Sequence, residues 1–536
     1  MKHVVHPGTG ACNALRALRL LFLAAFALAG AVAAWAAAPA LLVQKCGACH
    51  MDEKQTMQRM SNIRKSPEGW EMTIVRMGIW HKVDLTRAER KVLVKYLADT
   101  QGLAPQESAP YRALIERQPN IPDVVPSEDL SQMCARCHSF GRVALQRRDT
   151  DEWRKLVHTH MGQYPSIEYS AQGRDRNWFD LAAGEVAAKL GELYPYSTQE
   201  WKRWQRARHR PPTGSWRVAG HRPGAGAYAG TLQVRALGQD RYAARYDLLY
   251  DNGNRVTGEG DAVVYAGYEW RGSALLGNQE TRSVFALSAD GKTMAGRWFM
   301  RRADEVGARF EAVRVDAARP GTLISVSPAL LKSGETATLR VSGNKLPATF
   351  DLGPDVRVEK VVRVSEDESQ LTVKVADGAA TGWRKLGAGM AGTDIKFAIY
   401  RQLDSVRVEP PFAFARLGGG TNPPVTAQFQ AIGYLNGADG KPDTEDDIRL
   451  GPVDAAWSVD NQDEKAKAAN DVGFAGVMEP TGQFLPAPAG PNPLRNNLSN
   501  VGDLAVIAAV KDGPRTVTGR GRLVVAVQRW NTPPLR

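Results

Sequence analysis

The chain has 536 residues, a net charge of +12, 43% hydrophobic residues and 24% charged residues. A single hydrophobic core stops growing at roughly 250–300 residues, so this length predicts several domains. The composition is that of a globular protein, which excludes wholesale disorder and a multi-span membrane protein. The positive charge is modest and forms no concentrated Lys/Arg stripe, so it does not indicate nucleic-acid binding.

The N-terminus has the pattern of a secretion signal. Positive charges precede an apolar stretch from Leu20 to Ala34, and the small-residue motif Ala34-Trp35-Ala36 follows. We predict a signal peptide at residues 1–36 and a mature protein in the periplasm that has no membrane span. An uncleaved anchor is the alternative, although the apolar stretch is shorter than the roughly 20 residues that a span needs.

The four cysteines that remain after the signal lie in two CxxCH motifs. These motifs are Cys46-Gly47-Ala48-Cys49-His50 and Cys134-Ala135-Arg136-Cys137-His138. Two cysteines at this spacing can form thioethers with the vinyl groups of one haem, and the histidine that follows is placed to bind the iron. A redox dithiol or half of a zinc site would leave both histidines unexplained. We predict two covalently bound haems c, with His50 and His138 as proximal iron ligands.

An internal repeat suggests the second axial ligand of each iron. The repeat places Trp70, Ile74 and Met77 at the same spacing as Trp153, Val157 and His160. Positions i, i+4 and i+7 share one helix face. We therefore predict Met77 and His160 as distal ligands. Four rivals within about one turn stay open, of which His81 and Met161 are the main alternatives: Met72, His81, His158 and Met161.

A second amphipathic helix is predicted in each half, at residues 85–98 and 181–193. Each helix pair would enclose one haem. We therefore predict an N-terminal helical dihaem cytochrome c domain at residues 37–212. It would consist of two units, at about residues 40–118 and 119–210.

Strand patterns dominate the rest of the chain. Apolar residues alternate with polar ones, and Asn252-Gly253 and Asp290-Gly291 are strong hairpin turns. We predict a multidomain α+β protein in which the helical domain precedes three antiparallel β domains. They would be a β-barrel at 213–318, an Ig-like β-sandwich at 319–402 and a C-terminal β-sandwich at 403–536.

Two features of the β-rich part could suggest ligand sites. Residues 436–447 are acidic and glycine-punctuated, but they lack the full EF-hand calcium pattern, so we expect an exposed acidic turn there. Four tryptophans are expected in protein cores rather than in a ligand site: Trp216, Trp270, Trp298 and Trp457. The sequence contains no hydrolase or kinase signature.

The whole arrangement resembles the α subunit of quinohemoprotein amine dehydrogenase. The resemblance rests on KCGACH (45–50), MCARCH (133–138), ISVSPALLKSGETATLRVSG (324–343) and DSVRVEPPFAFARLGGGTNPP (404–424). It implies a heterotrimer with a β-propeller subunit and a small subunit that holds a cysteine tryptophylquinone. It also implies oxidation of primary amines to aldehyde and ammonia, with a copper protein or cytochrome c as external electron acceptor.

After two haems are attached, no cysteine remains in the mature chain to build such a quinone. The resemblance therefore places the quinone and the catalytic residues in another subunit, and we expect no catalytic residue in this chain. Two alternatives from other classes remain. One is a dihaem peroxidase, which needs an open sixth position on one iron. The other is a free-standing periplasmic electron carrier with β binding modules.

Overall fold

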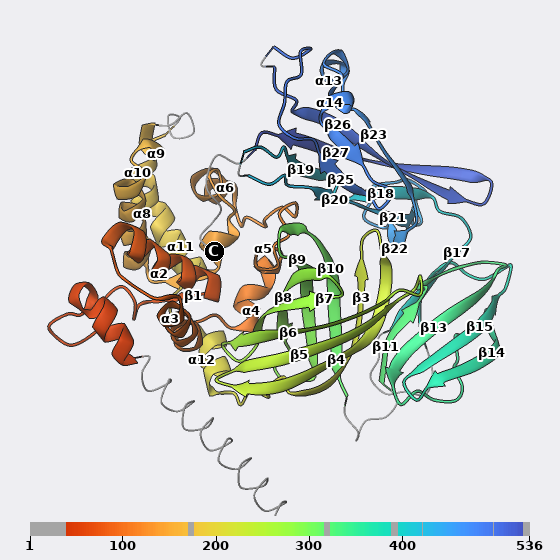
Figure 1. Cartoon of the computed structure of the whole chain (residues 1–536), viewed down its shortest axis with the longest axis horizontal. Coiled ribbons are helices and arrows are strands. Elements are labelled where there is room, and N and C mark those ends of the chain that lie inside the picture. Colours follow the sequence, from red (N-terminus) through yellow and green to blue (C-terminus); the bar gives the residue numbers. More distant parts are fainter. Residues whose placement is uncertain are drawn as a thin grey trace, which may run out of the picture.

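The computed structural model describes residues 39–169, 176–315, 322–386, 395–420, 422–496 and 498–528. A helical N-terminal part lies against several β-rich parts, as predicted (Figure 1). The predicted signal peptide, residues 1–36, lies outside the described residues. Within these ranges, none of the helices is both long enough and apolar enough to cross a membrane.

The helical part begins with a helix that includes residues 39–50 and carries the first CxxCH motif. Side-chain caps begin the two helices that carry the predicted distal ligands. Ser66 accepts from the Gly69 N–H in α2, and Asp149 accepts from the Glu152 N–H in α8. The second predicted helix of the second half is divided by a π-helical turn, η2. The elements are β1 (Ile63–Lys65), α2 (Pro67–His81), α3 (Arg87–Thr100), α4 (Pro105–Ser108), η1 (Ala109–Tyr111), α5 (Arg112–Ile115), α6 (Glu128–Cys134), α7 (Gly141–Ala144), β2 (Gln146–Arg148), α8 (Thr150–Gln163), α9 (Ser166–Tyr169), α10 (Trp178–Leu181), η2 (Ala182–Val186), α11 (Ala187–Leu193) and α12 (Gln199–Arg206).

The two repeats of the helical part meet about a local twofold axis at strands β1 and β2. Strands β1 and β2 pair antiparallel, with Ile63 opposite Arg148, Arg64 opposite Arg147 and Lys65 opposite Gln146. Arg64 and Arg147 occupy equivalent positions in the two repeats, because the same spacing separates Trp70 from Trp153. Equivalent residues therefore face each other at the centre of the pairing, and the axis passes between them.

The repeat is also visible around its two tryptophans. Trp70 and Trp153 are 1% and 2% exposed, and each has a buried cation above its ring. Lys65 Nζ lies 5.5 Å from the Trp70 ring centroid, and the guanidinium carbon of Arg148 lies 5.7 Å from that of Trp153. The tryptophans therefore lie in the cores of the repeats. Their burial determines which face of α2 and of α8 is turned toward the core.

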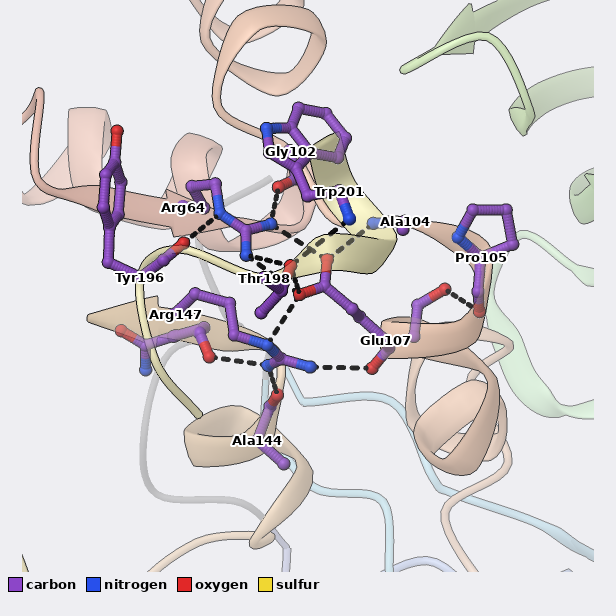
Figure 2. Close-up of polar contacts among 12 residues, drawn as sticks. Arg64, Gly102, Ala104, Pro105, Glu107, Ala144, Arg147, Tyr196, Thr198 and Trp201 are labelled. Carbon is purple, nitrogen blue, oxygen red and sulfur yellow. Dashed lines mark hydrogen bonds and ion pairs between the residues drawn. The ribbon is translucent and has the colours of Figure 1, made fainter. Parts of the chain in front are cut away.

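A buried carboxylate on α4, Glu107, holds the two central arginines together (Figure 2). Arg64 donates two hydrogen bonds of 2.9 Å to Glu107, and Arg147 Nε donates one of 3.0 Å. The Thr198 hydroxyl donates at 2.9 Å and the Ala104 N–H at 2.8 Å. Burial opposes ionisation of Glu107, but the two guanidinium groups outweigh it and lower the pKa of this carboxyl. Glu107 is therefore a charged clamp at the twofold axis.

The next part is a closed eight-stranded antiparallel barrel in the order β10-β3-β4-β5-β6-β7-β8-β9. Both predicted hairpin turns join neighbouring strands, and Gly253 and Gly291 adopt φ of 84° and 65° there. The predicted core tryptophans Trp216, Trp270 and Trp298 fill the barrel. The strands are β3 (Gly214–Arg222), β4 (Gly226–Gly238), β5 (Arg241–Tyr250), β6 (Arg255–Tyr265), β7 (Glu269–Leu276), β8 (Gln279–Leu287), β9 (Thr293–Met300) and β10 (Ala303–Arg314).

The helical part and the barrel share their hydrophobic cores. Trp201 and Trp204 of α12 belong to the core of the barrel. In the other direction, Val284 of β8 and Phe299 of β9 belong to the core of the second helical repeat. The change from helices to strands along the sequence therefore does not separate two independently packed cores.

A buried ion-pair network also joins the two parts. Glu269 of β7 accepts from Arg112 Nη1 at 2.9 Å and from Arg271 Nη1 at 2.7 Å, and Arg271 also pairs with Glu68 of α2. Burial opposes ionisation of Glu269, but Arg271 and Arg112 outweigh it and lower the pKa to about 2.

We expect acid to weaken this junction in a defined pH window. The pKa of Glu269 is about 2 in the folded protein, against an ordinary value of 4.5. Between these values the unfolded chain binds more protons, so the stability that Glu269 contributes is complete above pH 4.5 and is lost as the pH falls toward 2. The measurement is the unfolding free energy of the unmodified chain and of Glu269→Gln against pH. A difference between the two chains that stays constant through this window would contradict the assignment.

The described residues of the C-terminal parts form five further sheets. The prediction of purely antiparallel domains is wrong at two positions, because β12 pairs parallel with β17 and β19 pairs parallel with β27. Each of these strands joins the sheet beside a strand from a distant part of the sequence. Trp457 packs on the last core, as predicted. The elements are β11 (Thr322–Ser327), β12 (Leu330–Lys332), β13 (Thr336–Asn344), β14 (Val356–Ser365), β15 (Glu368–Val375), β16 (Gly382–Lys385), β17 (Lys396–Tyr400), β18 (Ser405–Glu409), β19 (Phe412–Arg416), β20 (Ala427–Gln428), β21 (Gln430–Leu435), β22 (Ile448–Val453), β23 (Ala456–Asn461), α13 (Glu464–Ala468), α14 (Asp471–Phe474), β24 (Gly476–Met478), β25 (Gln483–Pro486), β26 (Gly502–Asp512) and β27 (Arg515–Ala526).

Candidate functional site

The two CxxCH motifs lie at helix ends on the surface of the helical part. In each motif the first cysteine is half-buried and the second is exposed. Burial raises the pKa of Cys46, and burial together with Asp129 raises the pKa of Cys134 to about 12. A redox-active dithiol needs a lowered thiol pKa. These thiols are therefore not tuned for disulfide exchange.

The histidine of each motif is oriented by a backbone carbonyl. His50 Nδ1 lies 3.1 Å from the Gln58 carbonyl oxygen, and His138 Nδ1 lies 3.0 Å from that of Ser139. A carbonyl oxygen only accepts hydrogen bonds, so Nδ1 is the protonated nitrogen. Nε2 then carries the lone pair, which is the arrangement that lets an imidazole bind iron through Nε2.

The predicted distal residues occupy equivalent positions on α2 and α8. His160 Nδ1 lies 2.9 Å from the Leu156 carbonyl oxygen, which again leaves the Nε2 lone pair available. His138 and His160 are close enough to influence each other: burial lowers the pKa of His138 most, and the charge of His160 contributes to the same effect. Met77 is half-buried on α2. His138 and His160 are therefore near enough for their charges to interact, and their joint role in a haem site stays a prediction.

The four rival distal residues differ in exposure and in the side chains that they contact. His81 is exposed at the last position of α2, and exposed His158 meets the ring of Phe179 edge-on, with 5.1 Å between centroids. Met161 packs on the core of the second repeat. The sulfur of Met72 is contacted by two arginine side chains, Arg76 at 3.2 Å and Arg142 at 3.1 Å.

Sequence reasoning missed Arg142 and its equivalent in the first repeat, Arg59. Arg142 follows the second CxxCH motif, and Arg59 follows the first at the equivalent position of the repeat. Each one reaches across the twofold axis: Arg142 contacts Met72 of α2, and Arg59 Nη2 lies 3.4 Å from Thr159 Oγ1 of α8. The signal that could have found them is the repeat itself, because Arg59 and Arg142 are separated by the same spacing as Trp70 and Trp153.

Comparison with known families covers almost the whole chain. Four family models match, all from quinohemoprotein amine dehydrogenase: alpha subunit haem binding at residues 36–201, and alpha subunit domain II at 209–315, domain III at 320–401 and domain IV at 406–535. This chain belongs to the quinohemoprotein amine dehydrogenase alpha subunits. It is thus a haem-binding subunit of an oxidoreductase, and an alpha subunit implies that other subunits exist.

Solved structures resemble only parts of this alpha subunit. The redesigned β-barrel mFAP1 bound to DFHBI is 13% identical, covers 19% of this chain and 90% of its own, and has a TM-score of 0.17. Zebrafish RET cadherin-like domains 1 to 4 are 10% identical, cover 46% of this chain and 62% of their own, and have a TM-score of 0.18. At these scores the similarities carry no argument about function. No curated protein matches the alpha subunit.

The residues of both motifs fit a covalently held haem. Each motif supplies two thiols and an imidazole whose Nε2 is available. The zinc alternative would need further ligands, but in the part of the alpha subunit that the structure describes no three His, Cys, Asp or Glu side chains are grouped to hold a metal ion. The raised thiol pKa values argue against the dithiol alternative.

The acidic loop at 436–447 does not collect its carboxylates around a cation. Asp446 Oδ2 accepts from the backbone N–H groups of Ala438 and Asp439, and Asp447 pairs with Arg407. The carboxylates therefore stabilise the turn itself. The alpha subunit also has a cavity of about 710 Å³ between the barrel and the last part. Arg302 lines it from the barrel side, and residues 418–420, 422–424, 486 and 488 line it from the other side.

Proposed function

We propose that this alpha subunit is the dihaem electron-transfer subunit of a periplasmic quinohemoprotein amine dehydrogenase. The observation that carries the proposal is the duplication: two CxxCH motifs stand in two repeats that pair about one axis, within the region that matches the haem-binding family model. The finer division of the β-rich part belongs to the proposal, with an Ig-like β-sandwich at 319–402 and a β-sandwich at 403–536.

The residues of this chain would hold the haems and set their properties. A covalently bound haem supplies one-electron redox chemistry at its iron. Cys46 with Cys49, and Cys134 with Cys137, would form the thioethers, and His50 and His138 would be the proximal ligands. Met77 and His160 would bind from the distal side. Methionine–histidine ligation raises a reduction potential, so the two sites would differ in potential.

The quinone chemistry would belong to a partner. A cysteine tryptophylquinone needs a cysteine, and the two haems use all four cysteines of the mature chain. We therefore place it in a small subunit, with a β-propeller subunit completing a heterotrimer. The small subunit would oxidise primary amines to aldehyde and ammonia. The alpha subunit would then take up its two electrons and pass them singly to a copper protein or cytochrome c.

Adding a primary amine to natively purified protein tests this proposal. We expect the haem absorption bands to become reduced only when the small quinone-bearing chain copurifies. If the bands do not change with amine but do change with peroxide, the chain is a dihaem peroxidase instead. A chain that purifies alone, and that loses partner binding when residues 213–536 are deleted, would be a free-standing electron carrier.

The distal assignment in the first repeat can be tested by Met77→Ala. We expect this variant to lose the near-infrared absorption band of sulfur-ligated haem iron, because alanine offers the iron no thioether. Its first haem should also titrate at a lower potential. Met161→Leu is the matched control, since Met161 packs on a core, and it should keep the band. A band that survives in Met77→Ala would overturn the assignment.

A further inference from the structure

Two guanidinium groups from different repeats converge on one sulfur atom. Arg76 Nη2 of α2 lies 3.2 Å from Met72 Sδ, and Arg142 Nη2 of α7 lies 3.1 Å from the same atom. We call Arg76 and Arg142 the arginine pair. A thioether is only a weak hydrogen-bond acceptor, and two like charges this close repel each other. Among the described residues, no carboxylate forms an ion pair with either arginine.

The surroundings of the arginine pair add positive charge. Lys65 is buried, and after burial the charges of Arg148 and Arg76 are the main causes that lower its pKa. The buried acid of this region, Glu152, is already paired with Arg148 at 3.8 Å and with Lys155 at 2.7 Å. Within the part of the chain that the structure describes, cations are therefore concentrated between α2 and α8 without a matching anion.

The arginine pair lies beside the proposed axial ligands of the second haem. Arg76 reaches this region through Met72, whose sulfur it shares with Arg142. Arg142 also follows His138 by only four residues in the chain. Both guanidinium groups therefore lie near the second CxxCH motif.

We propose that Arg76 and Arg142 bind the propionate carboxylates of the haem attached at Cys134 and Cys137, and thereby raise its reduction potential. A guanidinium group matches a carboxylate with two parallel hydrogen bonds. Reduction of the iron removes one positive charge from the site, so nearby cations favour the reduced form. Because Arg76 comes from the other repeat, the haem would also bind the two repeats together. This inference rests on the proposed function, since it requires the haems to be present.

The test is a redox titration of the haem-loaded full chain, followed by absorption and electron paramagnetic resonance. In Arg76→Leu and Arg142→Leu we expect the second haem to shift toward the oxidised form by roughly tenfold, which is a potential about 59 mV lower for one electron. Lysine variants keep the charge and should titrate close to the unmodified chain. Arg154→Leu is the matched control, because Arg154 is an exposed arginine of α8 already paired with Asp151, and it should not shift.

Resonance Raman spectra give a second readout that does not depend on the potential. The propionate bending modes should move in both leucine variants and, because lysine lacks the planar fork, also in the lysine variants. If the leucine variants fail to fold, the lysine variants still test the contact. Two haems with unchanged potentials and unchanged propionate modes would overturn this inference alone. Loss of partner copurification with unchanged potentials would assign the arginine pair to an acidic partner surface instead. An unmodified chain without covalent haem would overturn the proposed function as well.

Discussion

The double variant Cys134→Ala/Cys137→Ala should carry one covalently attached haem where the unmodified chain carries two. Alanine offers no sulfur to the vinyl groups, so the second repeat would lose both of its thioethers. The motif at Cys46 and Cys49 would remain intact. Intact-protein mass and the pyridine haemochrome content per chain both measure this change directly.

The chain contains its own control for this experiment. Cys12 lies in the predicted signal peptide, so Cys12→Ala should leave the mature protein with both haems. A double variant that keeps two haems would contradict the assignment of the second motif. A haem count of zero would instead mean that the first motif depends on the second for attachment.

Replacing Glu107 with alanine should destabilise the helical part by about 3–5 kcal/mol, because it leaves two buried guanidinium groups without their anion. Glu107 is 7% exposed and accepts hydrogen bonds from Arg64 and Arg147, the two residues at the twofold axis (Figure 2). Their mutual repulsion would then act directly on the pairing of β1 with β2. The measurement is chemical denaturation followed by haem absorption, which reports on the helical part alone.

Glu311→Ala is the matched control for this variant. Glu311 also pairs with an arginine, but the side chains of Arg309 and Glu311 are 75% and 50% exposed. A solvated pair of this kind is worth at most about 1 kcal/mol. If Glu107→Ala costs no more than Glu311→Ala, the clamp does not stabilise the twofold pairing.

The sequence predicted the features that depend on local periodicity. Helical spacing placed Trp70 and Met77 on one face of α2, and alternation with Asn-Gly and Asp-Gly turns placed the barrel hairpins. The parallel pairing of β12 with β17 and of β19 with β27 could not be read in this way, because alternation looks the same whichever direction the neighbouring strand runs.

The tertiary contacts of the candidate site were also beyond local patterns. Glu107 stands in the first turn of a four-residue helix, where an acidic residue is usually solvated. Its role follows only from the pairing of β1 with β2, and these strands have three residues each. The contact of Arg142 with Met72 depends on the same pairing. Such short strands leave too little periodicity in the sequence to predict it.

The shared packing of the helical part and the barrel has a consequence for the order of maturation. Val284 and Phe299 complete the core of the second repeat, yet ribosomes make them more than a hundred residues after Cys137. As the polypeptide emerges vectorially, the second repeat therefore lacks part of its interior until β8 and β9 arrive. We expect its cysteines to stay accessible to an attachment enzyme during that interval, because the core beside Cys134 is still incomplete. A fragment that contains only the helical part would lack Val284 and Phe299, and so part of the core of the second repeat.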